Sequence, residues 1–278
     1  MYINQSYRPK RLIVVDNCST DGTIDFLKDW ENREEGIYKK VIYLESNQGG
    51  SGGFYAGLED ALKYDDIDWI WVADDDAFPS LNAFENAKIF IDNNQELIKK
   101  SSAICGVCGF DNHISPIQRS FLKKTVFGIQ EFPIKEKYYK GKDYFKINLY
   151  SFVGTIMKKE NLKQAGLPRK DFFIYQDDLE HSVRMGKTGD IYCVTSIKIE
   201  HKDNVAPKNI TSWRDYYASR NLTVMYKEHF GKWSLFCRII RRKLFAFITL
   251  NYSKFKLVNL AIKDGKEGRM GIHPVYKP

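Results

Sequence analysis

The chain has 278 residues, which is enough to bury a full core and form one large domain or one domain with appendages. Its apolar fraction of 43%, with 14% aromatic residues, is that of a globular protein and excludes a disordered chain. A formal net charge of +8 favours polyanionic partners. These include nucleic acid, phosphorylated small molecules and an anionic membrane surface, and charge alone does not choose among them.

The cysteines and the lack of long apolar segments bear on where the chain works. Five cysteines are dispersed along it, which favours reduced thiols in a cytosolic protein over a disulfide framework. Cys105 and Cys108 form a CxxC with no second pair, so core packing is expected there instead of zinc. Neither a secretory signal nor an apolar run of spanning length is found, which predicts a chain on the cytoplasmic side.

The N-terminal part of the chain alternates strand and helix patterns. RLIVVD predicts a buried strand over 11–16, helical spacing predicts a helix over 23–30, and VIYLES predicts a strand over 41–46. The run NQGGSGG, residues 47–53, then precedes a helix. Glycines before a helix commonly cradle a phosphate or sugar, but this spacing matches no nucleotide fingerprint, so a flexible loop stays open. The residues concerned are Asn47, Gly49, Gly50, Gly52 and Gly53.

The stretch WIWVADDDAF, residues 69–78, predicts a buried strand that stops on three successive carboxylates. Ligands of open α/β sheets bind at the carboxyl ends of strands, where adjacent anions need water or a cation to neutralise them. Asp74 and Asp76 are expected on one side and Asp75 on the other, which suits Mg²⁺ or Mn²⁺. A solvated acidic turn is the alternative. The strand and helix alternation favours a mostly parallel sheet.

Residues 102–111 predict a further strand, after which the pattern becomes irregular. Aromatic residues lie among lysines from 112 to 149, which predicts short strands and a loop that could close over a substrate. Such interleaving also occurs in proteins that bind single-stranded nucleic acid, but no nucleic-acid motif supports that partner here.

A second acidic cluster lies in FFIYQDDLEHSVRMGKTG, residues 172–189. Asp177 and Asp178 precede a predicted helix, so the simplest interpretation is capping by carboxylates at the helix N-terminus. The alternative is a general base that accepts the proton of an attacking hydroxyl. Two acids where one cap suffices favour the functional interpretation.

A strand predicted over 191–201 ends at His201, which could complete a carboxylate cation site, although a lone histidine is more often structural. The helix predicted over 212–229 carries Arg214 and Arg220 beside tyrosines. Either arginine could bind a diphosphate or an acidic acceptor, and surface salt bridging is the alternative.

From Lys232 onward, apolar and basic residues predict an amphipathic helix at an anionic membrane surface or one that packs on the domain.

Taken together, these motifs resemble family 2 glycosyltransferases of the GT-A fold, within them the bacterial rhamnosyltransferase and galactofuranosyltransferase branch. The resemblance covers nearly the whole chain. It rests on VVDNCSTDGT, NQGGSGGFYAG, the ADDDA strand end, SFVGTIMKKENLKQAGLP with FFIYQDDLEHSVR, the strand-end EH, YYASRN and KDGKEGRMG.

The resemblance implies a donor site. Asp16 is similar to the aspartate that contacts the base or ribose, and the run from Asn47 to Gly53 would lie along the donor sugar. Asp74 and Asp76 look like the DxD pair at the ribose, diphosphate and metal, with Asp75 between them.

The resemblance also implies the catalytic groups. His201 looks like the third protein group on the metal. Asp178 matches the catalytic base, and Asp177 lies beside it as an orienting or acceptor-binding acid. Arg220 and Asn221 belong to the YYxxRN element, whose role the resemblance does not assign.

The implied fold is an α/β GT-A domain over residues 1–210, followed by a helical, basic, membrane-associating region over 211–278. One departure is expected. Family members begin with a strand that here precedes Met1, and this strand normally lies in the middle of the sheet. We therefore expect a GT-A sheet without its first strand, whose neighbours keep unpaired backbone groups.

The implied function is an inverting glycosyltransferase dependent on Mn²⁺ or Mg²⁺. It would move rhamnose or galactofuranose from a UDP- or dTDP-linked donor to a hydroxyl of a lipid-linked or saccharide acceptor, in cell-surface polysaccharide synthesis. The expected location is peripheral, at the inner face of the plasma membrane, without nucleic acid as a partner. A sugar nucleotidyltransferase and a catalytically impaired membrane-associated scaffold stay open as alternatives.

Overall fold

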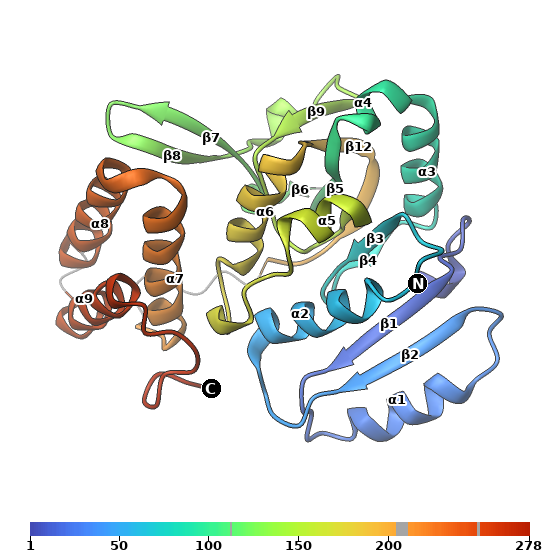
Figure 1. Cartoon of the computed structure of the whole chain (residues 1–278), viewed down its shortest axis with the longest axis horizontal. Helices are drawn as coiled ribbons and strands as arrows, with labels where there is room; N and C mark the ends of the chain where they lie inside the picture. The colour runs from blue at the N-terminus through green and yellow to red at the C-terminus, as the bar shows by residue number, and fades with distance from the viewer. Residues whose placement is uncertain (112, 204–210, 249–250) are drawn as a thin grey trace.

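The described residues form three β-sheets, two of which make up the centre of the protein, with helices on their faces and three further helices at the C-terminal side (Figure 1). The computed structural model describes residues 1–111, 113–203, 211–248 and 251–278. The smaller sheet pairs β1 (Arg11–Asp16) with β2 (Tyr38–Tyr43) in parallel. The larger sheet has the strand order β3 (Trp69–Val72), β11 (Thr155–Lys158), β5 (Ser101–Phe110), β12 (Asp190–Glu200) and β4 (Phe78–Pro79).

The larger sheet is mixed. β5 and β12 pair in parallel, whereas β11 lies antiparallel between β3 and β5. β3, β5 and β12 therefore point the same way, which agrees with the alternation of strands and helices. The α/β class is confirmed, but the prediction of a mostly parallel sheet is wrong, because the chain enters β11 from antiparallel strands that need no crossover helix.

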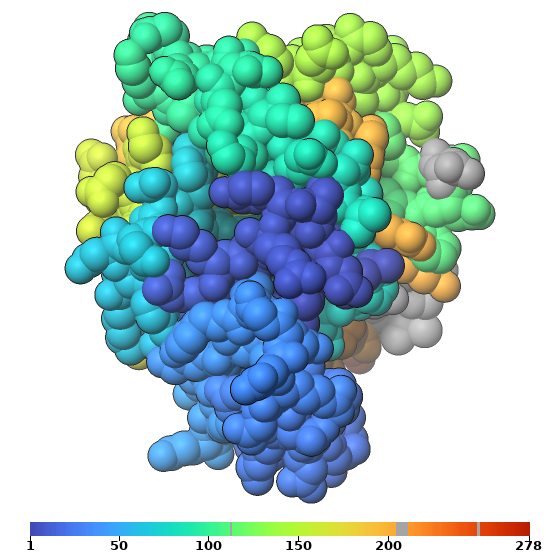
Figure 2. Space-filling view, turned by 90° about the vertical axis from the view of Figure 1, so that its right-hand side faces the viewer, coloured from blue at the N-terminus to red at the C-terminus, as the bar shows by residue number. Residues whose placement is uncertain are grey.

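In the part of the chain that the structure describes, no strand of the smaller sheet pairs with a strand of the larger one. Within the described residues β1 pairs only with β2, and β3 only with β11, so each has one edge without a strand partner. Strand pairing is therefore interrupted between the two sheets. The N-terminal segment lies on the surface there, between the β1–β2 unit and α3 (Ala83–Asn93), as Figure 2 shows in dark blue. Its Tyr2 hydroxyl donates to the carbonyl oxygen of Ala77 at 2.8 Å.

Helices cover both faces of the larger sheet. One hydrophobic cluster joins the sheet to α2 (Gly49–Ala61), α5 (Lys159–Ala165) and α6 (Asp177–Thr188). The other cluster joins it to α3 and α4 (Gln95–Lys99). α1 (Thr23–Asn32) packs on the smaller sheet. Cys105 and Cys108 lie in these clusters and are almost fully buried, so their predicted packing role is confirmed.

The short strands predicted for the segment between residues 112 and 149 are confirmed in its described part. β7 (Arg119–Thr125) and β8 (Gly128–Pro133) form a hairpin, and β10 (Leu149–Tyr150) extends it. Three short elements complete this region, namely β6 (His113–Ile114), η2 (Glu136–Tyr138) and β9 (Tyr144–Ile147). The hairpin packs on α8 (Gly231–Ile248), since the amide of Ile129 donates to Ser234 Oγ at 3.0 Å. The hairpin is therefore fixed against α8, and the loop expected to close over a substrate stays a prediction.

The C-terminal region consists of α7 (Arg214–His229), α8 and α9 (Tyr252–Glu267), so the segment after Lys232 forms two helices and not one. A separate hydrophobic cluster around Tyr216, Tyr217 and Leu257 holds α7 and α9 together. The predicted domain boundary at residue 210 lies outside the described residues. None of the helices in the described part of the chain combines the length and hydropathy that crossing a bilayer would require.

Candidate active site

The acidic turn after β3 and the residue after β12 meet at one edge of the larger sheet. β3 and β12 point the same way, so their carboxyl ends share this edge. The turn is tight, because the amide of Ala77 donates to the carbonyl oxygen of Asp74 at 3.2 Å. His201 is held in place by its own amide, which donates to the carbonyl oxygen of Gly109 at 2.9 Å.

Asp74, Asp76 and His201 are close enough to share one cation. One potential ligand atom from each lies within 4.8 Å of the others, and His201 Nε2 is 3.4 Å from Asp76 Oδ1. Two carboxylates and an imidazole form a donor set that suits Mn²⁺, and the carboxylate oxygens suit Mg²⁺. These three residues therefore fit the predicted metal site. Asp75 is exposed and lies outside this group.

Desolvation by the surrounding protein raises the pKa of Asp74 to about 6, although its side chain still reaches solvent. The nearby carboxylate of Asp76 raises this pKa further, and His201 opposes the rise. Repulsion between the two carboxylates is what a divalent cation would relieve.

A further carboxylate supports His201 from behind. Asp203 Oδ1 lies 3.6 Å from His201 Nδ1, an atom that is buried and has no hydrogen-bond partner in the described residues. Asp203 is itself held, because Ser115 Oγ and Gln118 Nε2 donate to its two oxygens at 2.5 and 2.8 Å. In metal sites such a carboxylate orients the ligating imidazole.

The second acidic pair faces the same site from the N-terminus of α6. Burial raises the pKa of Asp177 to about 6, and Asp74 contributes to the rise. Desolvation raises the pKa of Asp178 well above its usual range, with the adjacent Asp177 as the next cause and Asp74 as a further one. Asp178 Oδ1 accepts a hydrogen bond from the amide of Leu179 at 2.7 Å. The structure thus brings Asp74, Asp177 and Asp178 within electrostatic reach of one another.

The loop that enters α6 is strained. Phe173, Tyr175 and Gln176 have φ angles of 67°, 67° and 69°, which non-glycine residues rarely adopt. Such a conformation persists only where surrounding contacts hold it.

Arg220 and Asn221 of α7 hold this loop. The amide of Asn221 donates to the carbonyl oxygens of Phe172, Ile174 and Tyr175 at 2.8–3.0 Å. The guanidinium of Arg220 donates to the carbonyl oxygens of Asp171 and Phe172. Arg220 is 1% exposed, so the interpretations as a diphosphate-binding residue and as a surface ion pair are both wrong for it. Arg214 is exposed, as expected.

The predicted donor residues of the smaller sheet lie at the carboxyl ends of β1 and β2. Asn17 and Asn47 join these ends, because Asn17 Nδ2 donates to Asn47 Oδ1 at 3.2 Å. Asp16 is buried, and its Oδ2 accepts from the amide of Ser19. Its other oxygen, Oδ1, is buried without a partner in the described residues. A ligand hydroxyl or base N–H would satisfy it.

The glycine run is part of a helix and not of a loop before one. α2 begins at Gly49, where φ is +69° and an added Cβ would lie 2.0 Å from the carbonyl oxygen of Phe173. Gly49 therefore lets α2 pack directly against the loop that precedes α6. An added Cβ at Gly50 or Gly53 would meet no atom within 4 Å, so both leave open space beside the backbone, whereas one at Gly52 would meet Gln48.

A second cluster of possible metal ligands is an ion-pair network. Burial by itself would raise the pKa of Glu180. Hydrogen bonds from His229 and Arg184 outweigh this effect and lower the pKa to about 2. Glu228, the third member of this cluster, pairs with Arg169. Because Arg184 and Arg169 already pair with the two carboxylates, the cluster ties α6 to α7 and is not a metal site.

Sequence reasoning missed the residues that support the site. Asp203, Ser115 and Gln118 lie behind His201, and Gln176 has a buried Oε1 without a partner in the described residues, next to Asp177. Asp203 follows His201 by two residues, which is the one signal that could have found it. Ser115 and Gln118 carry no local signal, because only the fold brings them there.

Solved structures share this fold. GalNAc-T7, solved with UDP, GalNAc and Mn²⁺, matches with a TM-score of 0.61 over 93% of this chain and 50% of its own, at 11% identity. The mannosyltransferase PcManGT from Pyrobaculum calidifontis, in complex with GDP-Man and Mn²⁺, has a TM-score of 0.54 over 98% of this chain and 70% of its own, at 15% identity. The fold is the GT-A fold, as the resemblance implied.

The sequence itself places the chain in a family. The model of glycosyl transferase family 2 matches residues 2–166, more than half of the chain, so the chain belongs to this family. The galactofuranosyltransferase GlfT1 of Mycolicibacterium smegmatis is 23% identical over 187 residues, which cover 67% of this chain. The chain spans 59% of the length of that relative.

Replacing Asn221 by alanine should lower the free energy of unfolding by about 2–4 kcal/mol, because the carbonyl oxygens of Ile174 and Tyr175 lose their donor and that of Phe172 loses one of its three. Asn32→Ala, which removes one exposed hydrogen bond to Lys28, is the matched control and should change stability by less than about 0.5 kcal/mol. Urea unfolding of both variants measures the difference. Equal midpoints would show that Asn221 does not hold the strained loop.

Proposed function

We propose that the chain is a metal-dependent, inverting glycosyltransferase that moves a sugar from a nucleotide-diphosphate donor to an acceptor hydroxyl. One observation carries the proposal. Three separate segments bring the pair Asp74 and Asp76, the imidazole of His201 and the acid pair Asp177 and Asp178 to one site. Membership of glycosyl transferase family 2 supports the same reaction class.

The donor would lie along the carboxyl ends of β1, β2 and β3. The unpaired Oδ1 of Asp16 suits a hydroxyl of the ribose or an N–H of the base. The open backbone at Gly50 and Gly53 leaves room for the sugar or diphosphate. Asp74, Asp76 and His201 would hold Mn²⁺ or Mg²⁺, which when bound stabilises the charge that grows on the leaving diphosphate.

Asp178 would act as the base. Its place at the N-terminus of α6 fixes the carboxylate, and its raised pKa brings its proton affinity closer to that needed for general-base catalysis. It would take the proton of the acceptor hydroxyl as this oxygen attacks the anomeric carbon from the face opposite the diphosphate. The C–O bond to the diphosphate breaks as the new C–O bond forms, so the anomeric configuration inverts.

The finer substrate proposals rest on likeness. Galactofuranose as the sugar is supported by the likeness to a galactofuranosyltransferase. Rhamnose as the alternative sugar, and UDP or dTDP as the carrier, stay predictions. A lipid-linked or saccharide acceptor, in cell-surface polysaccharide synthesis, is proposed as the partner of this donor. The peripheral location at the inner face of the plasma membrane stays a prediction.

Turnover of candidate donors tests the proposed function. With Mn²⁺, the chain is incubated with UDP-galactofuranose and dTDP-rhamnose, and the nucleotide products are separated. Release of UDP or dTDP that stops with a chelator is expected. Pyrophosphate chemistry would indicate the nucleotidyltransferase alternative, and no turnover of any donor would favour the scaffold. Once an acceptor is known, the anomeric proton of the product reports inversion or retention.

Gly53→Ala should separate folding from donor binding. Alanine inside α2 should stabilise the fold by about 0.5–1 kcal/mol, since its Cβ meets no protein atom. The same methyl group should lower donor affinity about tenfold, because it fills space proposed for the donor. Gly186→Ala on α6 is the matched control, where the added Cβ has an ordinary contact at 3.8 Å. It should leave donor affinity unchanged, and equal affinities for both variants would contradict the donor path.

Asp178→Asn should abolish turnover and leave donor binding intact. In the intact chain, activity should be lost as pH falls through a pKa that lies above the usual value of about 4 for an aspartate, because the base must be ionised and its pKa is raised. The rate is measured against pH for the intact chain and for Asp25→Asn, an exposed control on α1. An acid limb at the usual aspartate pKa, or an active Asp178→Asn variant, would argue against this base.

A further inference from the structure

The outward surface of α8 is apolar, as the core-facing side of a packed helix ordinarily is. Five large apolar side chains recur every three or four residues and so share one helical face. Each is between 48% and 63% exposed. They are Trp233, Phe236, Ile240, Leu244 and Phe247, and we call them the outer face of α8. Helices packed on a protein ordinarily turn such a face toward the core, and exposed apolar patches of this kind mark interaction sites.

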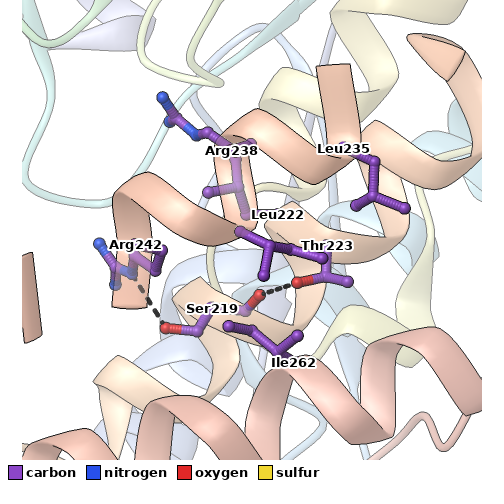
Figure 3. A pocket seen from close by; sticks show the side chains of 8 residues that line it. Ser219, Leu222, Thr223, Leu235, Arg238, Arg242 and Ile262 are labelled. Atoms are coloured by element: carbon purple, nitrogen blue, oxygen red, sulfur yellow. Dashed lines mark hydrogen bonds between the residues drawn. The ribbon is translucent and has the colours of Figure 1, made fainter. Parts of the chain in front are cut away.

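The opposite face of α8 carries arginines toward the protein. Arg242 Nε donates to Ser219 Oγ of α7 at 3.1 Å, as Figure 3 shows. Arg238 lies over the ring of Tyr226 and 3.8 Å from Glu131. Both line a cavity of about 10 Å³ between α7, α8 and α9, which is room for no more than a water molecule. The inward side of α8 is therefore mixed, because Leu235, Ile239 and Ala246 pack on the protein beside these arginines, whereas the outer face of α8 points away from it.

The tip of the β7–β8 hairpin continues the outer face. Val126 and Phe127 at the tip are 81% and 63% exposed. Trp233 Nε1 donates to the carbonyl oxygen of Val126 at 3.0 Å, which fixes the tip beside the start of α8. Gly128 allows this approach, because an added Cβ would lie 2.4 Å from Ser234 Oγ. The tip and the outer face thus form one apolar surface from two distant parts of the sequence.

Positive charge borders this surface. With 3.6 residues per turn, Lys232 and Lys243 lie along one edge of the outer face. A hollow of about 230 Å³ opens beside it and is lined by Lys243, Lys263 and Lys266. Glu267, the acid that also lines the hollow, pairs with Arg269. The hollow therefore presents ammonium groups that anionic headgroups would complement.

We propose that the outer face of α8 and the hairpin tip dock into an anionic lipid bilayer, with α8 lying in the plane of the interface. The apolar side chains would enter the boundary between headgroups and acyl chains, and the lysines would contact the headgroups. Trp233 suits this boundary, because indole has one apolar and one polar edge. A second copy of the chain fits less well, since a symmetric contact through this face would bring the lysine borders together.

The proposal deepens the proposed function, because it places the acceptor reaction at a membrane, but its test needs no donor. Co-sedimentation is measured with vesicles of phosphatidylcholine alone and with about 30% phosphatidylglycerol. The intact chain is compared with Phe127→Ser/Leu244→Ser and with Phe26→Ser, which removes an equally exposed ring from α1. All of these side chains are exposed, so the variants should fold, and equal urea midpoints confirm it.

The intact chain and Phe26→Ser should bind the anionic vesicles at least tenfold more tightly than the neutral ones, with binding that weakens as salt rises. The double variant should lose at least tenfold in affinity. Equal binding by the double variant, or equal binding to neutral vesicles, would overturn the proposal. The proposal would also be overturned if the intact chain bound no vesicles and formed a dimer that the double variant does not form, because a second copy would then cover this face. Failure here would leave donor turnover untouched, so the two proposals fail separately.

Discussion

Repulsion between carboxylates is the constraint on which the site depends. Asp74 and Asp76 follow one strand, Asp177 and Asp178 begin a helix, and their charges act on one another. Burial is the largest cause that raises the pKa values of Asp74, Asp177 and Asp178, and neighbouring carboxylates raise them further. His201 offers partial compensation, and its Nε2 completes the set of atoms that could share a divalent ion. A site that is unfavourable when empty and neutralised by a metal is suited to binding the charged diphosphate of a donor.

The rest of the protein holds these groups against that repulsion. The strained loop before Asp177 is fastened from behind by Arg220 and Asn221, whose donors reach the backbone carbonyl groups of the loop. α9 and the residues after it complete this support. Arg220 Nη1 donates to the carbonyl oxygen of Gly271, and the Tyr216 hydroxyl donates to Asp264 at 2.7 Å. The C-terminal helices therefore have two roles, since α7 holds the loop before Asp177 on one side and α8 presents its apolar face on the other.

Much of the site follows from local sequence, and the rest depends on the fold. An apolar run that stops on acids predicts a strand end, and the order of strands predicts that Asp74, Asp76 and His201 share an edge. The burial of Arg220 was not predictable, because its sequence pattern is that of an exposed basic helix and only the contact with the loop explains it. The antiparallel orientation of β11 was missed, because a short apolar run indicates a strand but not its direction relative to neighbouring strands. The glycines of α2 were assigned to a loop from propensity, whereas packing of Gly49 on Phe173 favours a helix.

The central claim is that Asp76, with Asp74 and His201, holds the metal through which the donor diphosphate binds. Calorimetry of UDP and dTDP binding tests it most directly, on the intact chain and on Asp76→Ala, with and without Mn²⁺. The account predicts binding of one nucleotide that requires Mn²⁺ and is lost in the variant, while both proteins unfold at similar urea concentrations. Metal-independent binding, or equal binding by Asp76→Ala, would contradict the assigned site. Absence of binding by the folded intact chain would contradict the claim that it uses a nucleotide donor.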